Sequence, residues 1–568
     1  MSSILGQKLV RHLINLFVCA LGLTASPLLA AQAKPSRTVF GLTNLIDVHL
    51  RADAAEWKKL QPPPGTKTGI LGIMLAFEDV LKDAAAGKHF WSDKSTRPGL
   101  AGYLGVDHQF GRAEATIDGE TVSGIGLRYK GNGTFLEGFN ARKLSFKLDF
   151  SEYESEQQFR GLTKLNLNNC VTDPSMLREA LSYELFREAG VPGPRVGFAR
   201  LSLTVPGEVE KKSCGLYTVV EQVDKRFLKD RYDSADGLLL KPTTFGIFRY
   251  LGENWEDYVK PYAPKTDPTP AQQRRVIDFA RLLNQSDDAA FAEKVEEFLD
   301  VDEFLRFLAV NVLLSNLDSF LGGTQNHYVY LEPRSNKFQF LPWDMDHSFG
   351  AFPMEGSPDA RRDLSIDRPG GNRNRLIERV LKIPRHKEKF RAYLAEYLGS
   401  IFAEEKMHRQ ISVTADFLRP LIRENGDKAP ERFERVLADA PSAQEAHPLK
   451  FFVTKRRESV QRQLDGKSSG YVPFTGDLKA LPIRKILIFG AALLLLLLLN
   501  AFGWLWGVIA GFRGSAGWGV LNLFFYPVTP VIYGFRVQQK LGRRCAWWAL
   551  TAGLCVMVWI AAAVVMFK

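Results

Sequence analysis

The chain has 568 residues, of which 45% are hydrophobic and 24% are charged, a composition typical of a globular protein. Its formal net charge of +11 comes from its two ends. Residues 1–33 carry Lys8 and Arg11 without an acidic residue, and residues 479–568 carry nine lysines and arginines without one. Residues 34–478 are therefore neutral overall. They lack the positive excess that binding a nucleic-acid backbone requires, so we expect no nucleic-acid partner.

The first 33 residues predict an export signal. Basic residues come first, residues 13–25 form an apolar stretch, and Ala31-Gln32-Ala33 provides a cleavage site of small residues. The apolar stretch is short for a membrane-spanning helix, although an uncleaved anchor is the alternative. In either case, the domain that follows is exported.

Residues 483–568 predict a membrane region with two or three transmembrane segments. Residues 486–506 and 547–566 are apolar and long enough to cross a bilayer as helices. Between them, residues 518–533 are apolar but shorter and are interrupted by two prolines. This middle segment predicts either a third, kinked span or a re-entrant hairpin.

The charges near these segments predict the orientation of the chain. The loop at residues 536–544 is the most basic one and should face the cytoplasm. Residues 34–466 would then form a domain on the extracytoplasmic side, held at the lipid bilayer through a linker at residues 467–482. We therefore expect a membrane protein with an exported soluble domain.

The predicted soluble domain contains two cysteines, Cys170 and Cys214. Export makes one disulfide between them possible, and two buried free thiols are the alternative. The sequence does not fix the distance between the two residues, so both states stay open.

Strand patterns dominate the first half of this domain and helical patterns the second half. The predicted strands are residues 38–50, 114–117, 122–129, 143–150, 216–223 and 338–343, with a hairpin turn at Asp118-Gly119. The main predicted helices are residues 70–86, 178–189 and 301–317. Segregation of strands and helices along the chain predicts an α+β fold and is compatible with a two-lobed arrangement.

Acidic and amide side chains gather in a short part of the second half. Asp318 and Asn326 follow the predicted helix at 301–317, and Asp344 and Asp346 follow the predicted strand at 338–343. Carboxylate and amide oxygens are hard ligands suited to Mg²⁺ or Mn²⁺ held together with phosphates. Each residue alone could equally be a helix cap or a turn residue. Their concentration favours a functional site.

A second candidate site lies in the first half. Asn132 stands between two glycines in a turn between strands, where backbone amides could approach a phosphate. The strand that follows places Lys143 and Lys147 on one face, because alternate residues of a strand share a face. Glu179 and Glu221 are candidate ion-pair partners for such a lysine. The alternative is that each is an ordinary solvated charge on the surface.

The order of several motifs resembles the CotH family of spore-coat-type atypical protein kinases. The resemblance covers most of residues 38–465. The motifs that carry it are residues 128–135 with 143–147, 173–179, 215–221 with 224–228, 311–318, 326–330 and 340–350.

The resemblance implies a kinase-like, two-lobed domain. It also implies transfer of phosphate from ATP to Ser or Thr of a protein substrate, including autophosphorylation, with Mg²⁺ or Mn²⁺ as the metal. The H-R-D signature of ordinary kinases is absent from the chain.

The resemblance also implies roles for single residues. Asp318 is similar to the catalytic aspartate, and Asp344 to the metal-binding aspartate, with Asp346 as the alternative. Asn326 is expected as a second metal ligand. The expected cofactor-binding residues are Asn132, Lys143 or Lys147 as the phosphate-contacting lysine, and Glu221 or Glu179 as its partner.

Two other functions compete with a kinase. One is a degenerate kinase fold that serves as a scaffold in the cell envelope or at the cell surface. The other is a metal-dependent hydrolase that uses Asp344, Asp346 and His347. Binding of a nucleotide would separate the kinase from both.

Overall fold

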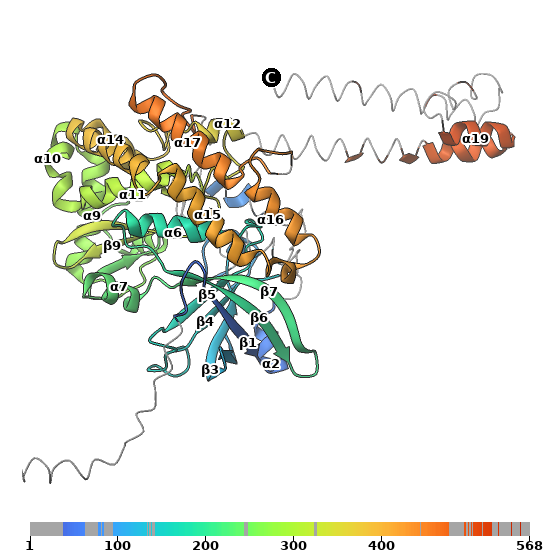
Figure 1. The fold of residues 1–568 in the computed structure, drawn as a ribbon, viewed down its shortest axis with the longest axis horizontal. Coiled ribbons are helices and arrows are strands. Elements are labelled where there is room, and N and C mark those ends of the chain that lie inside the picture. The colour runs from blue at the N-terminus through green and yellow to red at the C-terminus, as the bar shows by residue number, and fades with distance from the viewer. Residues whose placement is uncertain are drawn as a thin grey trace, which may run out of the picture.

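The structure is a computed structural model (Figure 1). It describes residues 38–62, 95–132, 143–243, 248–322, 326–443 and 445–475, with residues 135 and 138, scattered positions between 76 and 83, and parts of 494–557. The predicted export signal and much of the predicted membrane region lie outside the described residues. So does most of the helix predicted at residues 70–86.

The first half of the domain is a sheet that closes on itself. Its strands follow the order β1-β2-β3-β4-β5-β7-β6, and the circle closes because β1 pairs in parallel with β6. All other neighbours in this sheet are antiparallel. The strands are β1 (Leu45–Arg51), β2 (Gly111–Ile117), β3 (Glu120–Tyr129), β4 (Phe146–Asp149), β5 (Lys164–Asn168), β6 (Val196–Val205) and β7 (Val209–Glu221).

Alternation along these strands fills the interior of the sheet. On β3, Ile125, Leu127 and Tyr129 are buried, and on β4, Phe146 and Leu148 join them in one apolar cluster. The short helices α2 (Ala54–Leu60) and α4 (Leu100–Tyr103) flank this half. The predicted hairpin at Asp118-Gly119 is confirmed, and both residues have the positive φ that a tight two-residue turn needs.

The second half is helical around a small sheet of order β10-β9-β8. Its strands are β8 (Leu238–Leu240), β9 (His327–Glu332) and β10 (Lys337–Pro342). Its helices are α6 (Arg178–Glu188), α7 (Lys225–Tyr232), α8 (Glu256–Tyr262), α9 (Pro270–Gln285), α10 (Asp288–Phe298), α11 (Val301–Leu313), α12 (Pro358–Arg362), α13 (Arg375–Lys382), α14 (Pro384–Gly399), α15 (Glu404–Leu418), α16 (Ala429–Leu437) and α17 (Leu449–Leu464), with the short turns η1 (Phe320–Gly322) and η2 (Ile422–Asn425).

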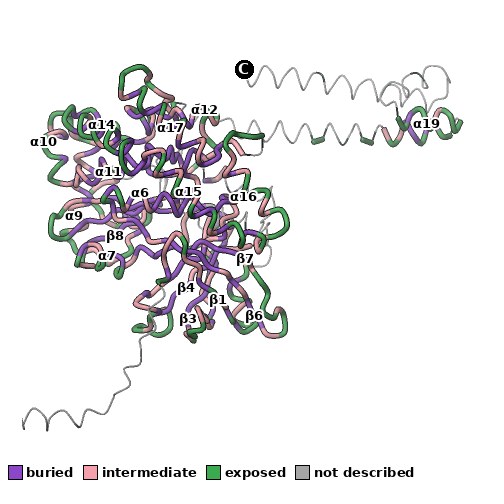
Figure 2. The backbone as a smooth tube through the Cα atoms, in the orientation of Figure 1, coloured by how far each residue is buried: buried purple, intermediate pink, exposed green. Residues whose placement is uncertain are grey.

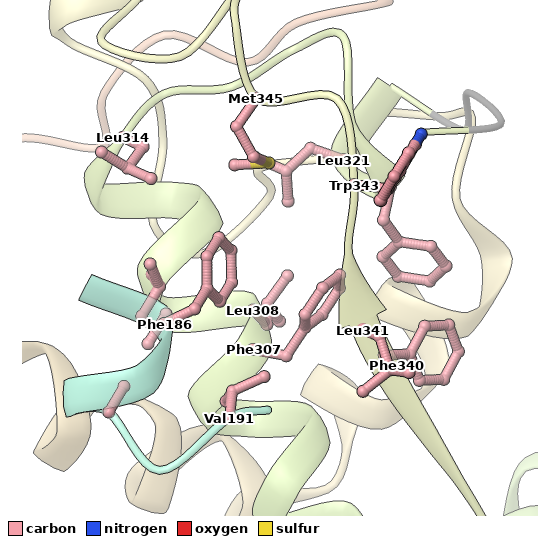
Figure 3. Packing of buried hydrophobic residues seen from close by; sticks show 14 of the residues in the cluster. Phe186, Val191, Phe307, Leu308, Leu314, Leu321, Phe340, Leu341, Trp343 and Met345 are labelled. Carbon is pink, nitrogen blue, oxygen red and sulfur yellow. The ribbon is translucent and has the colours of Figure 1, made fainter. Parts of the chain in front are cut away.

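One large apolar cluster holds the helical half together. Buried segments run through the centre of this half in Figure 2, and Figure 3 shows side chains of α6, α11 and the β10 region packed in the same cluster. The Arg456 side chain is wholly buried in it and donates to the carbonyl oxygens of Val312 (2.9 Å) and Leu364 (2.7 Å). A buried guanidinium requires such acceptors, and these bonds tie α17 to α11.

The described structure confirms a mixed α+β fold. The strand-rich half lies below the helical half in Figure 1, and α6 lies at their junction. The predicted helix at 178–189 is confirmed as α6, whereas the helix predicted at 301–317 ends at Leu313. Ser315 has a φ of 45°, a left-handed conformation that stops the helix and turns the chain.

The described residues cover only part of the predicted membrane region. Among the helices that can be described, α19 (Ala516–Phe524) included, none is both long and apolar enough to cross a bilayer. Both predicted spans fall largely on residues outside the described ranges.

Cys170 and Cys214 are free thiols in the structure. Burial raises the pKa of Cys170 to about 12 and also raises the pKa of Cys214. Since the thiolate is the reactive form, both should react slowly in the folded domain.

We expect iodoacetamide to label neither thiol fully in the native protein and to label both once the protein is denatured without a reductant. Mass spectrometry of the two cysteine-containing peptides measures the labelling. Recovery of the two peptides joined to each other in the unreduced sample would contradict the free-thiol state.

Candidate functional site

A cavity of about 1100 Å³ lies between the two halves. Strands β3, β4 and β5 and the start of α6 line one side of it. The loops that follow α11 and β10 line the other. The cavity therefore brings together residues that are far apart in the sequence, which is typical of a ligand site at a junction of two substructures.

The loop after β10 directs carboxylates into the cavity by alternation. Asp344 and Asp346 line the cavity, whereas Met345 between them is buried in the apolar cluster (Figure 3). Trp343, before them, belongs to the same cluster and also borders the cavity. Asp344 has a φ of 58°, a left-handed conformation that is uncommon for a residue other than glycine. Backbone strain of this kind is frequent where a side chain must be aimed at a ligand.

Asp318 reaches the same cavity from the turn after α11. The Asn326 side chain donates to its carboxylate (3.1 Å) and to its backbone oxygen (2.8 Å). Burial raises the pKa of Asp318 to about 7, the charges of Asp346 and Asp344 add to this rise, and His347 opposes it. The predicted residues Asp318, Asn326, Asp344 and Asp346 thus lie in one electrostatic group.

Helix α6 holds this acidic wall in place. The Asp344 backbone N–H donates to the Tyr183 hydroxyl (3.0 Å), and that hydroxyl donates to Glu179 (3.2 Å). Thr172 donates to the Asp346 carboxylate (2.6 Å). Burial raises the pKa of Asp344, and its neighbour Asp346 raises it further. Fixed bonds of this kind keep like charges close together although they repel each other.

Glu179 owes its place to the turn before α6. The Asp173 carboxylate accepts hydrogen bonds from the Arg178 backbone N–H (2.9 Å) and the Ser175 hydroxyl (2.6 Å), and so ties this turn to the first residue of the helix. Glu179, in the first helical turn, then lines the cavity and accepts from Asn168 (2.8 Å). Burial raises its pKa to about 7, the charge of Asp344 adds to the rise, and Lys130 opposes it.

The cavity lining also carries cations, which we call the basic wall. The basic wall is defined as Arg97, Arg128, Lys130, Lys147, Lys241 and Lys265, and Lys164, Lys225 and Arg226 line the cavity as well. In the described part of the chain none of the six residues of the basic wall forms an ion pair within 4.0 Å. Burial lowers the pKa of all six, and repulsion from neighbouring cations contributes in each case except Arg128. A wall of cations without carboxylate partners is a site for an anion.

Three of these cations donate to amide oxygens rather than to carboxylates. Lys130 donates to Asn168 (2.5 Å), Lys147 to Gln222 (2.8 Å), and Arg97 to the predicted cofactor residue Asn132 (3.4 Å). An amide holds the side chain in position without neutralising its charge. The charge therefore stays available for a ligand.

The structure separates the alternatives that the sequence left open. Lys147 lines the cavity, whereas Lys143 lies outside its lining and donates to the Leu216 carbonyl (2.7 Å) and Asn425 (2.9 Å). Glu179 lines the cavity, whereas Glu221 forms ion pairs with Arg195 (2.5 Å) and Arg231 (2.7 Å).

Sequence reasoning missed Lys130 as a member of the site, although it lies within a motif that we had singled out. Arg128 and Lys130 are two residues apart at the end of β3 and both line the cavity, so strand alternation was the available signal. Lys241 and Lys265 carry no comparable signal, because they lie outside the motifs of the first half.

The acidic wall has the chemistry of a divalent-metal site. Within the described residues no three His, Cys, Asp or Glu side chains are preassembled as a metal-binding group. Asp344, Asp346 and the amide of Asn326 are nevertheless hard oxygen ligands on one cavity. Mg²⁺ is commonly held by one or two carboxylates, with substrate phosphates and water completing its shell. The residues therefore fit Mg²⁺ or Mn²⁺ bound together with a phosphate compound.

A model of the protein family described as CotH kinase protein matches residues 127–460. The chain belongs to the CotH family. The match includes the acidic wall and, of the basic wall, all but Arg97.

Curated relatives agree with this assignment. The chain is 26% identical to inner spore coat protein H of Bacillus subtilis over 306 residues, which are 52% of this chain and 78% of that protein. It is 23% identical to invasin CotH3 of Rhizopus delemar over 263 residues, which are 45% of this chain and 43% of that protein. Invasin CotH2 of the same fungus is also 23% identical, over 44% of its length.

The positions of the two glutamates predict different effects on stability. Glu221→Gln removes a buried charge that pairs with two arginines. We expect the free energy of unfolding to fall by about 2 kcal/mol. Solvent partly screens Arg195, so the pair with Arg195 contributes less of this loss than the pair with Arg231. Glu179→Gln should change it little, because the pKa of Glu179 near 7 leaves the carboxyl partly uncharged already.

Urea denaturation of the two variants beside the wild type measures the difference. Equal losses of stability in both variants would contradict the assignment of Glu221 to the framework and of Glu179 to the cavity.

Proposed function

We propose that this chain is an exported, membrane-anchored atypical protein kinase. It binds ATP with Mg²⁺ or Mn²⁺ in the cavity and transfers phosphate to Ser or Thr of a protein substrate, itself included. The observation that carries the proposal is the cavity itself, where a group of carboxylates and a group of cations line the same space. Its position between a strand-rich and a helical half supports a kinase-like, two-lobed arrangement.

The charges of the two walls suit a metal-bound polyphosphate. Among the residues that the structure describes, nine lysines and arginines line the cavity against seven aspartates and glutamates. A divalent ion on the acidic wall would make the cavity still more positive, so a strongly anionic ligand is needed to balance it. A nucleoside triphosphate has that charge and also bridges the metal to the cationic wall.

The two walls would divide the work of the reaction. Asp344 and Asp346, with Asn326, would hold the metal, which supplies charge stabilisation at the transferred phosphoryl group. Lys130 and Lys147 would contact the phosphates, and Glu179 would keep Lys130 oriented. This arrangement works by positioning and electrostatics more than by covalent chemistry.

Asp318 would act on the acceptor. Its carboxylate would accept the proton of the Ser or Thr hydroxyl while the hydroxyl oxygen bonds to phosphorus and the bond from phosphorus to the leaving ADP oxygen breaks. A pKa near 7 suits this task, because a general base is most effective when its pKa lies near the working pH.

The names of the relatives support an extracytoplasmic location. The bacterial relative is named for the spore coat, and the fungal relatives are named as invasins. Together with the predicted export signal and membrane region, these names favour a domain exposed outside the cytoplasm.

The division of labour predicts different effects for two variants. Asp344→Asn should weaken binding of ATP with Mn²⁺ and abolish autophosphorylation. Asp318→Asn should leave binding nearly intact and lower the rate of autophosphorylation by ~10²–10⁴-fold, the usual contribution of a positioned base. Labelled ATP measures turnover, and the rise in melting temperature with ATP and Mn²⁺ measures binding.

Asp416→Asn is a matched control, because Asp416 pairs with Arg419 on the surface of α15, away from the cavity lining. Removal of the metal with EDTA should abolish the melting shift of the wild type. Full turnover in both site variants would mean that the site is misplaced.

The same experiment decides between the competing functions. A wild type with neither a melting shift nor labelling would favour the scaffold. Hydrolysis of ATP without labelled protein, lost in His347→Ala and kept in Asp318→Asn, would favour the hydrolase.

A further inference from the structure

Residues 468–475, which belong to the predicted linker at 467–482, lie against the helical half, and we call them the docked strap. Tyr471 bridges to Leu364 like a short parallel strand, with its N–H donating to the Asp363 carbonyl (2.6 Å) and its carbonyl accepting from the Ser365 N–H (2.7 Å). The Ser365 hydroxyl donates to the carbonyl of Ser469 (2.7 Å). These bonds fix the backbone of a segment whose composition predicts a linker.

A single carboxylate fastens the far end of the strap. The Tyr471 hydroxyl (2.7 Å) and the Phe474 backbone N–H (2.9 Å) both donate to the same oxygen of Glu355. Glu355 lies in the loop that leads from the Asp344 region to α12. The strap is thus joined to the chain that follows the acidic wall.

Phe474 carries the strap into the apolar core. Its side chain is 4% exposed, and its φ of 52° is left-handed. The Arg373 guanidinium lies over the ring, 4.1 Å from its centroid. A residue that adopts an uncommon backbone conformation in order to bury an aromatic ring is a specific anchor rather than part of a loose connection.

The ring of Phe474 packs against the turn that carries Asp318. A Cβ built on Gly322, the last residue of η1, would lie 3.1 Å from the tip of the ring. The turn η1 begins two residues after Asp318. From another side, the Asn374 side chain donates to the Phe320 carbonyl of the same turn (2.6 Å). Phe474 and Asn374 therefore both support the segment that positions the Asp318 carboxylate.

We propose that the docked strap is a positioning device for Asp318, with Phe474 as its anchor and Tyr471 as its latch. When the strap is docked, η1 is held and Asp318 is aimed into the cavity. When it is released, η1 loses its support and the proton-accepting carboxylate is misplaced. The effect on turnover rests on the proposed kinase function, whereas the effect on η1 does not.

The strap lies outside the part of the chain that defines the family. The family match ends at residue 460, before the strap begins. The predicted first membrane span begins at residue 486, soon after it. The strap is therefore the place where the predicted membrane region would join the turn that carries Asp318, so release of the strap would link that attachment to activity.

The test compares Phe474→Ala with the wild type in the full chain. We expect kcat of autophosphorylation to fall by roughly 10–100-fold, the range for a displaced catalytic group, while the KM for ATP and the ATP–Mn²⁺ melting shift stay unchanged. Backbone hydrogen exchange of residues 316–322 should become faster, because η1 loses its support.

Phe433→Ala is the matched control, since Phe433 is a wholly buried phenylalanine of α16 in the same apolar cluster. It should lower the melting temperature but leave kcat and the exchange of residues 316–322 unchanged. If Phe474→Ala does not fold, Tyr471→Phe removes only the hydroxyl on Glu355 and should produce the same changes in weaker form.

Unchanged exchange of residues 316–322 in the strap variants would overturn the proposal, whether or not the protein transfers phosphate. Faster exchange with an unchanged kcat in an active protein would overturn the positioning role. If the wild type transfers no phosphate, the proposed kinase function fails, while the exchange measurement still decides whether the strap supports η1.

Discussion

The structure depends on holding many buried or half-buried charges around one cavity. Nine lysines and arginines and seven carboxylates of the described chain line it. Burial moves the pKa of the six cations of the basic wall, and of Glu179, Asp318 and Asp344, toward the neutral form. Such an arrangement survives only if the surrounding framework prevents the two walls from collapsing onto each other. The closed sheet carries Arg128 and Lys147, with Lys130 directly after β3. The helical half carries Lys241 and Lys265 together with Glu179, Asp318, Asp344 and Asp346.

Amide side chains keep the two sets of charges apart. Lys130, Lys147 and Arg97 donate to Asn168, Gln222 and Asn132, respectively, and the Asn168 amide also donates to Glu179. An asparagine that accepts from a lysine and donates to a glutamate satisfies both without an ion pair. A direct pair would lower the energy of the empty cavity, and a ligand would then have to break it. The amides favour the ligand-bound state instead.

The sequence predicted the composition of this site better than its contacts. The order of motifs and the acids after two apolar segments were enough to place Asp318, Asn326, Asp344 and Asp346 together. Strand alternation placed Lys143 beside Lys147, but β4 begins only at Phe146, so Lys143 leaves that register and turns toward Leu216 and Asn425. Glu221 depends on Arg195 and Arg231, which come from other segments and become its neighbours only in the folded chain. Local patterns carry no information about such neighbours.

The same limit explains why composition predicted a linker where the structure has a docked segment. Proline and glycine near residue 473 indicate an irregular backbone, but irregular backbone can still be fixed when one ring finds a place in the core. The Phe474 ring is buried in the core beside Gly322. Leu317 and Phe320, on either side of Asp318, are buried in the core as well. The acidic wall follows one rule throughout: apolar residues such as Met345 anchor each loop in the core, and the polar residues between them face the cavity. A carboxylate close to other carboxylates can be held there only if its neighbours in sequence are buried firmly enough to resist the repulsion. The strap extends that support beyond the residues that the family model matches.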